Sequence, residues 1–198
     1  MKSMIAAIGR ADPAMAAVID RSAPCVLRSP GPAPDYFDAL ARSILYQQLA
    51  GRAAAAIHSR FLNLFDGVPT PDRIIAASVE SLRGVGLSGA KARSIVDLAT
   101  KVVDGSVVLE GLEQADDEEV IRRLSQVRGI GRWTAEMFLL FVLGRVDVWP
   151  TGDFGVRKGY AVMHDFAAMP TALELGPLGD LYRPYRSVAA WYCWRAAE

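Results

Sequence analysis

The sequence lacks the features of membrane, metal and disulfide-bonded proteins. It has no run of about 18 uninterrupted apolar residues, so it predicts no membrane span. Residues 1–10 have an early Lys but no long apolar stretch before a small-residue cleavage site, so they predict no signal peptide. Its two cysteines, Cys25 and Cys193, and two histidines are too few for a four-cysteine iron–sulfur or zinc site. We therefore expect a cytoplasmic protein with reduced thiols and without membrane contact or a transition metal.

Net charge is also absent, because 22 basic and 22 acidic side chains cancel. Charge alone therefore gives no support to nucleic-acid binding. The charges are partly segregated, however, since an acidic cluster at 116–119 precedes Arg122, Arg123, Arg128 and Arg132. An acidic helix start and a basic helix end complement the helix dipole, but Arg128 and Arg132 flank a glycine turn and need another explanation.

The sequence does contain a succession of helix signals and no convincing strand. Apolar residues are 52% of the chain, enough for a sizeable core, and they recur with the helical period. Caps, prolines and glycines supply the expected boundaries. The expected helices begin at Tyr36, 53, Pro71, Ser88, Asp116 or Asp117, 133 and Asp153, and a last one lies within 184–195. This pattern predicts a compact all-α protein.

The stretch 124–135, Leu-Ser-Gln-Val-Arg-Gly-Ile-Gly-Arg-Trp-Thr-Ala, is the most informative motif. One helix ends, two glycines allow a tight turn, and a second helix begins, so that backbone N–H groups can point outward at an anion. Glycine also lets a phosphodiester approach closely, and such a contact binds the DNA backbone rather than its bases. A Gly-x-Gly alone commonly ends a helix, but the full string is more specific. A similar stretch lies at 82–92.

The string from Val127 to Ala135 closely resembles the DNA-binding motif of the helix–hairpin–helix (HhH-GPD) DNA glycosylase superfamily. The most similar branch is the bacterial 3-methyladenine DNA glycosylase II, or alkylpurine, branch. Its wedge turn resembles 44–50, Ile-Leu-Tyr-Gln-Gln-Leu-Ala, and its terminal aromatic helix resembles 186–194. The similarity extends from about Tyr36 to Trp194, most of the chain.

The resemblance implies an all-α, two-lobed fold with the active-site cleft between the lobes. A six-helix lobe at 36–145 would contain the helix–hairpin–helix at 124–135, and 1–35 plus 146–198 would form a second helical lobe with the catalytic aspartate. It also implies a base-excision-repair enzyme that flips alkylated purines, such as 3-methyladenine or 7-methylguanine, out of duplex DNA and releases them by hydrolysis.

On its local sequence Asp153 is a helix N-cap, and by the resemblance it takes the catalytic place. The two roles are compatible, because helix N–H groups favour the ionised carboxylate that would stabilise positive charge on the deoxyribose. Asp147 is the nearest competitor, but it lies further from the helix start.

Further site residues follow from the same resemblance. Alkylated purines are cationic, so an aromatic slot would attract them by stacking and cation–π contact. The expected slot residues are Trp133, Phe154 and Trp194, with Tyr192 a weaker candidate; Trp149 and Trp191 are expected in the core. Gln48 or Leu49 would be the wedge that fills the space of the flipped nucleotide. The expected DNA contacts of the hairpin are Gly129, Ile130, Gly131, Arg132 and Thr134.

The family implies no cofactor except a Na⁺ or K⁺ ion at the hairpin, held by the carbonyls of Ser125, Val127 and Ile130. Its lyase members have a nucleophilic Lys where Trp133 stands, which predicts a monofunctional enzyme, with Lys158 the only nearby amine to exclude. The expected partner is damaged double-stranded DNA, bound by a monomer that needs no other protein and associates with the nucleoid. Two alternatives stay open: a non-catalytic DNA-binding module, and a glycosylase for other damaged bases, including an oxidised-base enzyme with lyase activity.

Overall fold

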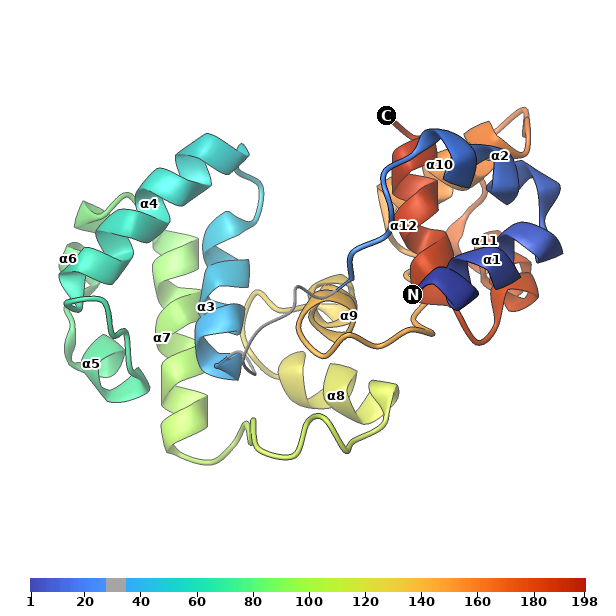
Figure 1. Ribbon diagram of the computed structural model, residues 1–198. Coiled ribbons are helices and arrows are strands. Elements are labelled where there is room, and N and C mark those ends of the chain that lie inside the picture. The colour runs from blue at the N-terminus through green and yellow to red at the C-terminus, as the bar shows by residue number, and fades with distance from the viewer. Residues whose placement is uncertain (28–34) are drawn as a thin grey trace. The chain divides into compact units, whose positions relative to one another are not determined.

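A computed structural model of the chain describes residues 1–27 and 35–198, and every regular element in these ranges is a helix (Figure 1). The prediction of an all-α fold is confirmed. The chain forms two compact units, one of Met1–Gly31 with Leu139–Glu198 and the other of Pro32–Phe138. None of the helices described is long and apolar enough to cross a membrane.

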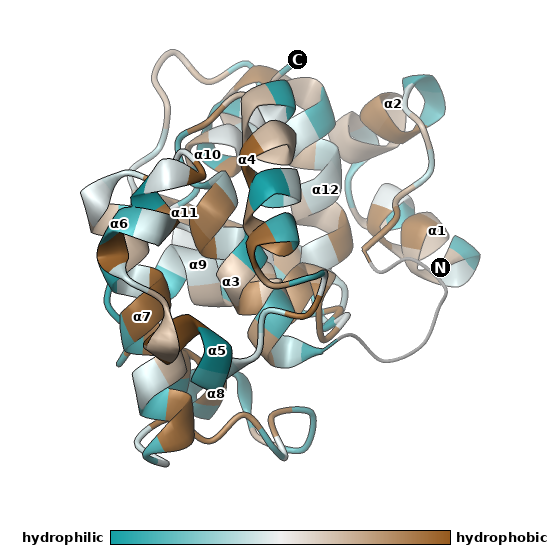
Figure 2. Ribbon diagram, turned by 90° about the vertical axis from the view of Figure 1, so that its left-hand side faces the viewer, coloured by the Kyte–Doolittle hydropathy of each residue, from teal (hydrophilic) through white to brown (hydrophobic). Residues whose placement is uncertain are grey.

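The unit of 32–138 is organised around α7 (Gly89–Val103), which lies beside α3 and also contacts α5 and α6 (Figure 1). Ile95 and Leu98 on α7 are fully buried. Most helices have both apolar and polar segments, drawn brown and teal in Figure 2, as expected for helices that cover a core. The other elements of this unit are α3 (Tyr36–Tyr46), α4 (Gly51–Leu64), α5 (Pro71–Ala76), α6 (Val79–Gly84), α8 (Asp117–Leu124) and the start of α9 (Arg132–Phe141).

The other unit is organised around α12 (Arg186–Ala196), which contacts α1, α2, α10 and the 3₁₀ helix η1. Helices α10 and α12 lie side by side (Figure 1). They approach so closely at Gly159 that a Cβ atom there would lie 1.7 Å from the carbonyl oxygen of Cys193. The remaining elements of this unit are α1 (Lys2–Ala11), α2 (Pro13–Arg21), α10 (Phe154–Met163), α11 (Ala172–Leu178) and η1 (Gly179–Tyr182).

Short polar side chains start the helices where the sequence predicts them. Thr70, Ser88, Asp116 and Asp153 each accept a hydrogen bond from a backbone N–H in the first turn of α5, α7, α8 and α10. The sequence prediction did not place α1, α2, α6 and α11. Asp12 caps α2, and this cap followed by a proline was a usable signal.

Candidate active site

Asp153 forms the N-cap of α10, and one oxygen of its carboxylate accepts hydrogen bonds from Val156 and Trp194. Its Oδ1 atom accepts a hydrogen bond of 2.8 Å from the backbone N–H of Val156 and another of 2.8 Å from the indole N–H of Trp194. The side chain is largely buried, since the residue is 7% exposed. The cap was predicted from the sequence, whereas the hydrogen bond from Trp194 could not be predicted from the spacing of residues. The result is a carboxyl group held in one orientation at a helix start, where the N–H dipoles of the helix point toward it.

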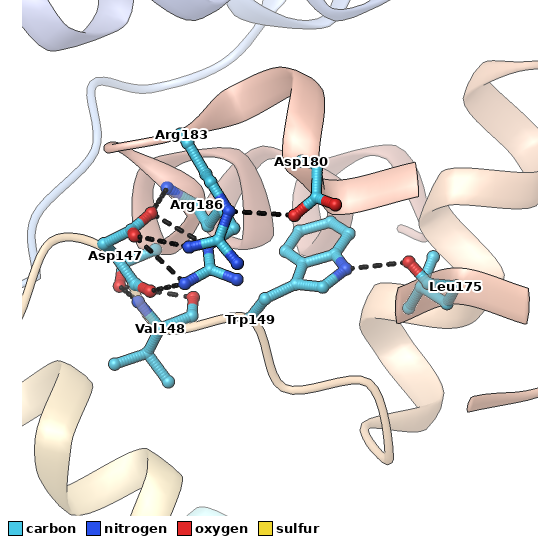
Figure 3. A network of polar contacts seen from close by, with 8 residues as sticks. Asp147, Val148, Trp149, Leu175, Asp180, Arg183 and Arg186 are labelled. Atoms are coloured by element: carbon cyan, nitrogen blue, oxygen red, sulfur yellow. Dashed lines mark hydrogen bonds and ion pairs between the residues drawn. The ribbon is translucent and has the colours of Figure 1, made fainter. Parts of the chain in front are cut away.

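The loop that leads to Asp153 is fastened at Asp147, the other carboxylate considered from sequence (Figure 3). Arg186 binds Asp147 with both ends of its guanidinium group, at 2.8 Å and 3.0 Å, and Arg183 adds a contact of 3.3 Å. Burial alone would raise the pKa of Asp147, but these arginines hold it below its ordinary value. Asp147 thus fastens the loop through two cations, so Asp153 is the better catalytic candidate.

Further along the loop, the hydroxyl of Ser187 accepts a hydrogen bond of 2.8 Å from the backbone N–H of Val148. The indole of Trp149 donates to the carbonyl of Leu175 at 3.0 Å (Figure 3). Trp149 is buried, which confirms the core position expected for it. These contacts attach the loop to α11 and α12 immediately before Asp153.

The aromatic candidates in this unit differ in accessibility. Phe154, next to Asp153, is 65% exposed. Trp194 is half-buried and stacks on Phe141, with ring centroids 5.7 Å apart and an angle of 26° between the planes. Tyr192 is only 1% exposed and borders a cavity of about 490 Å³ whose lining does not include Asp153. Phe154 and Trp194 are therefore the aromatic residues next to the carboxylate.

The two hairpin glycines have different structural requirements. Gly129 adopts a positive φ of 81°, and a Cβ atom there would lie 2.7 Å from the hydroxyl of Ser94. The fold itself thus requires glycine at 129. At Gly131, by contrast, a Cβ atom would meet no described atom within 4 Å. Gly131 leaves open space at the point where α9 begins, as a close external ligand would need.

Two side chains of α7, Asp97 and Lys101, hold the hairpin by hydrogen bonds. The carboxylate of Asp97 accepts a hydrogen bond of 2.7 Å from the backbone N–H of Arg128. Lys101 donates to Asp97 at 2.9 Å and to the carbonyl of Gln126 at 2.6 Å. Burial would raise the pKa of Asp97, but the bonds from Arg128 and Lys101 lower it overall. The turn is therefore held in shape by charged side chains on the helix beside it.

Two predicted DNA contacts of the hairpin are engaged within the protein. The guanidinium of Arg132 pairs with Glu118 at 3.0 Å and lies 3.5 Å from Glu136. The hydrogen bond with Glu118, reduced in part by burial, raises the pKa of Arg132. Thr134 is 5% exposed, and its hydroxyl lies 3.5 Å from the amide nitrogen of Gln47. Both residues have structural contacts besides any role on DNA.

The predicted wedge lies in the turn between α3 and α4. Gln48 is exposed and adopts a φ of 56°, an uncommon conformation for a residue with a side chain. Leu49 is 38% exposed. A strained, exposed turn persists only when its surroundings determine it, and such turns cluster at functional sites.

Two side chains that sequence reasoning missed hold this turn. The amide of Gln47 donates to the carbonyl of Gly129 in the hairpin at 2.9 Å. The ammonium of Lys91 donates to the carbonyl of Leu45 at 2.7 Å, and burial lowers the pKa of Lys91. Gln47 is adjacent to the predicted wedge, and Lys91 lies in the glycine-containing stretch 82–92. Both residues therefore lie beside motifs noted in the sequence, but the sequence did not show which carbonyl groups they bind.

The carbonyl oxygens of the hairpin were expected to hold a cation. Those of Gln126 and Gly129 already accept bonds from Lys101 and Gln47. Val127 accepts one from the N–H of Ile130 at 3.0 Å. Within the described part of the chain, no cluster of His, Cys, Asp and Glu side chains could hold a metal ion.

Comparison with known proteins supports the same assignment. The family model described as HhH-GPD superfamily base excision DNA repair protein matches residues 41–174. The DNA-3-methyladenine glycosylase 1 of Schizosaccharomyces pombe is 36% identical over 165 residues, which cover 82% of this chain and 72% of that protein. The DNA-3-methyladenine glycosylase 2 of Escherichia coli is 28% identical over 178 residues, covering 85% of this chain and 60% of that protein.

A solved structure of the Schizosaccharomyces pombe 3-methyladenine DNA glycosylase in complex with abasic DNA superposes with a TM-score of 0.82 and 31% identity. The match covers 97% of this chain and 95% of that one. The resemblance to the 3-methyladenine glycosylase branch is thus confirmed. The chain belongs to the HhH-GPD superfamily of base excision DNA repair proteins.

Proposed function

We propose that the protein is a DNA glycosylase that displaces an alkylated purine from duplex DNA and hydrolyses its N-glycosidic bond. The single observation that supports this most is the carboxylate of Asp153, fixed at the start of α10 by the N–H groups of Val156 and Trp194. The named relatives are 3-methyladenine DNA glycosylases, and one was solved with abasic DNA, the DNA product of such a hydrolysis.

In the proposed reaction the C1′–N bond breaks and its electron pair leaves with the purine. Alkylation has made that purine cationic, so it departs as a neutral base. Positive charge then develops on the deoxyribose, and the preorganised carboxylate of Asp153 stabilises it. A water oxygen adds to C1′, and its proton passes to the carboxylate and then to solvent. The products are the free base and an abasic site.

The hairpin is proposed to hold the DNA backbone. The open space at Gly131 suits a phosphate, since the first N–H groups of a helix have no partner within it and can bind an anion without regard to base sequence. Gln48 or Leu49 is proposed to occupy the space of the displaced nucleotide, and their exposure in a strained turn supports this role. Trp133, which is 48% exposed, Phe154 and Trp194 are proposed to contact the displaced base.

We also propose that the enzyme is monofunctional. By the resemblance, Trp133 occupies the position of the lyase nucleophile, and an indole cannot form an imine. The amine of Lys158 instead donates to the carbonyl of Ala197 at 2.8 Å. Incubation with lesion duplex and borohydride should therefore trap no covalent adduct, and strand breaks should appear only after alkali. A trapped adduct that is lost in Lys158→Ala would make the protein a lyase.

A Na⁺ or K⁺ ion is proposed to bind the carbonyls of Ser125, Val127 and Ile130. The choice of these three carbonyls follows the family resemblance, and it is compatible with the structure, in which the side chains of Lys101 and Gln47 donate to the neighbouring carbonyls of Gln126 and Gly129 instead. The ion would link the hairpin to a DNA phosphate. We further propose that the protein acts on DNA in the cytoplasm as a monomer and without an obligate protein partner. Light scattering with and without a lesion duplex would test whether it is a monomer.

The deciding experiment is incubation with methylated duplex DNA and identification of the bases released. The expected products are 3-methyladenine and 7-methylguanine, from the parent but not from Asp153→Asn. DNA binding without release of any base would instead favour a non-catalytic module. Release of oxidised bases would indicate a different lesion spectrum.

A further inference from the structure

Trp194 contacts the reacting carboxylate through its nitrogen, not only through its ring. The indole N–H and the backbone N–H of Val156 both donate to the same atom, Oδ1 of Asp153, each at 2.8 Å. Two donors on one oxygen fix the plane of the carboxylate and hence the position of its second oxygen. Hydrogen bonds to an ionised acceptor are among the stronger ones in proteins.

The surroundings of Trp194 keep its ring in this orientation. Phe141 stacks on one face of the indole, with 5.7 Å between ring centroids. Gly155 lies against its edge, where a Cβ atom would be 2.7 Å from Cδ1 and 3.2 Å from Nε1 of Trp194. Gly155 has no positive φ, so the space taken by the indole is the reason for glycine at this position.

We propose that Trp194 is a positioning residue for Asp153, and that its N–H group is what the reaction needs from it. This inference rests on the proposed function of Asp153 as the group that stabilises charge on the sugar. It differs from the stacking role that the family resemblance implies for the aromatic slot. With one ring face covered by Phe141, a displaced base could stack only on the other face.

Phenylalanine separates the two roles, because it keeps an aromatic face and lacks the N–H donor. Trp191 provides a matched control on the same helix, since its indole nitrogen is buried without a hydrogen-bond partner among the described residues. Trp194→Phe and Trp191→Phe are therefore the same chemical change, but only Trp194→Phe removes a hydrogen bond, the one to Asp153. Thermal unfolding of both variants would show whether either fold is disturbed.

Single-turnover base release and affinity for a lesion duplex should be measured separately. Trp194→Phe is expected to slow release by about 10- to 100-fold, as a misplaced catalytic group does, with affinity unchanged. Trp191→Phe should stay within about twofold of the parent in both measurements, because it removes no hydrogen bond. A parental release rate in Trp194→Phe, or a loss of affinity in place of rate, would overturn the inference.

A spectroscopic test does not depend on activity. The chain has 4 tryptophans, so ¹⁵N-labelled protein should give that number of indole signals, and Trp194→Phe assigns the one of interest. In Asp153→Asn this signal should move more than the others, since its acceptor loses its charge. An unmoved signal would refute the contact whatever the enzyme cleaves. If the parent releases no base from methylated DNA, the proposed function fails, while this spectrum still decides whether Trp194 positions the carboxylate.

Discussion

The two loops that lead into α9 and α10 make opposite use of a helix N-terminus. The loop before α10 ends in Asp153, whose side chain caps the helix and places a carboxylate at the positive end of its dipole. The loop before α9 ends in Gly131, which has no side chain to cap with and leaves open space. One helix start thus holds its own anion, while the other is left for an anion from outside, for which a DNA phosphate is the proposed occupant.

The two loops are also fixed by different means. Asp147, Val148 and Trp149 attach the loop before α10 to α12 and α11 (Figure 3). The hairpin before α9 is attached to α7 through the carboxylate of Asp97. In each case the loop is held by residues that are distant in sequence, so the geometry of the helix start depends on the surrounding unit.

The largest expected effect is at Asp153, at the end of the loop before α10. Asp153→Asn should lower the single-turnover rate of base release by about 100-fold or more, because the charge that stabilises the transition state is lost. Asparagine caps a helix about as well as aspartate, so folding should be unaffected. Affinity for the lesion duplex should stay near the parental value. A near-parental rate would remove Asp153 from the mechanism.

The next largest effect is expected at Gly131, the residue before α9. Gly131→Val should weaken binding of lesion and undamaged duplexes alike, by about 10-fold, because it obstructs N–H bonds to a charged phosphate. The fold should tolerate the change, since the new side chain would project into open space. Gly129→Val is the contrast, and it should destabilise the fold itself. Unchanged affinity in a folded Gly131→Val protein would refute the phosphate clamp.

A smaller effect is expected from releasing the loop before α10. Asp147→Asn should reduce the free energy of unfolding by about 1 kcal/mol at pH 7, a value discounted for the partial exposure of the ion pair. Because the folded-state pKa of Asp147 is below its ordinary 3.8, its contribution is present above that pH and is lost as the pH falls through the lowered value.

The difference between parent and Asp147→Asn in urea unfolding should therefore shrink under acid conditions. Asp180→Asn is the matched control, because it also loses a bond to Arg183, of 2.8 Å, but its side chain is 60% exposed. Its unfolding should hardly change at either pH. A difference for Asp147→Asn that is independent of pH would argue against the ion pair as its cause.

The smallest effect is expected at the wedge beside the hairpin. Gln48→Ala should slow release from a stably paired lesion by about threefold and from a mismatched lesion less, because a mismatched base is easier to unstack. The two substrates should be compared in single-turnover reactions with Gln48→Ala and Leu49→Ala. Equal losses on both substrates in Gln48→Ala would direct attention to Leu49 as the wedge.

The parts of the structure that the sequence predicted depend on neighbouring residues, although some local signals, such as the Asp12 cap of α2, were missed. Thr70, Ser88, Asp116 and Asp153 were expected as helix starts because a cap acts on the first turn that follows it. The glycine turn of the hairpin was visible for the same reason. The helix–hairpin–helix family could be predicted because its motif is short and its residues are close in sequence. The comparisons confirmed it.

What could not be predicted are contacts between distant segments. The bond from Gln47 joins residues 82 positions apart, and that from Trp194 to Asp153 joins residues 41 apart. No periodicity or spacing encodes which of several polar side chains will meet. The sequence therefore placed Trp194 beside the reaction as an aromatic ring, but its nitrogen could be assigned only from the fold.

The absent side chain at Gly159 has a consequence for the evolution of the protein. Helices α10 and α12 touch there through backbone alone, and α10 begins at Asp153 while α12 ends near Trp194. A methyl group at 159 would wedge the two helices apart and separate that carboxylate from its indole donor, without touching either of them. A substitution at Gly159 would therefore reduce base release by displacing Asp153 and Trp194 from each other, although it changes neither of them. A lineage that lost this glycine would regain the contact by returning to glycine or by changes in α12 that make room for the new side chain.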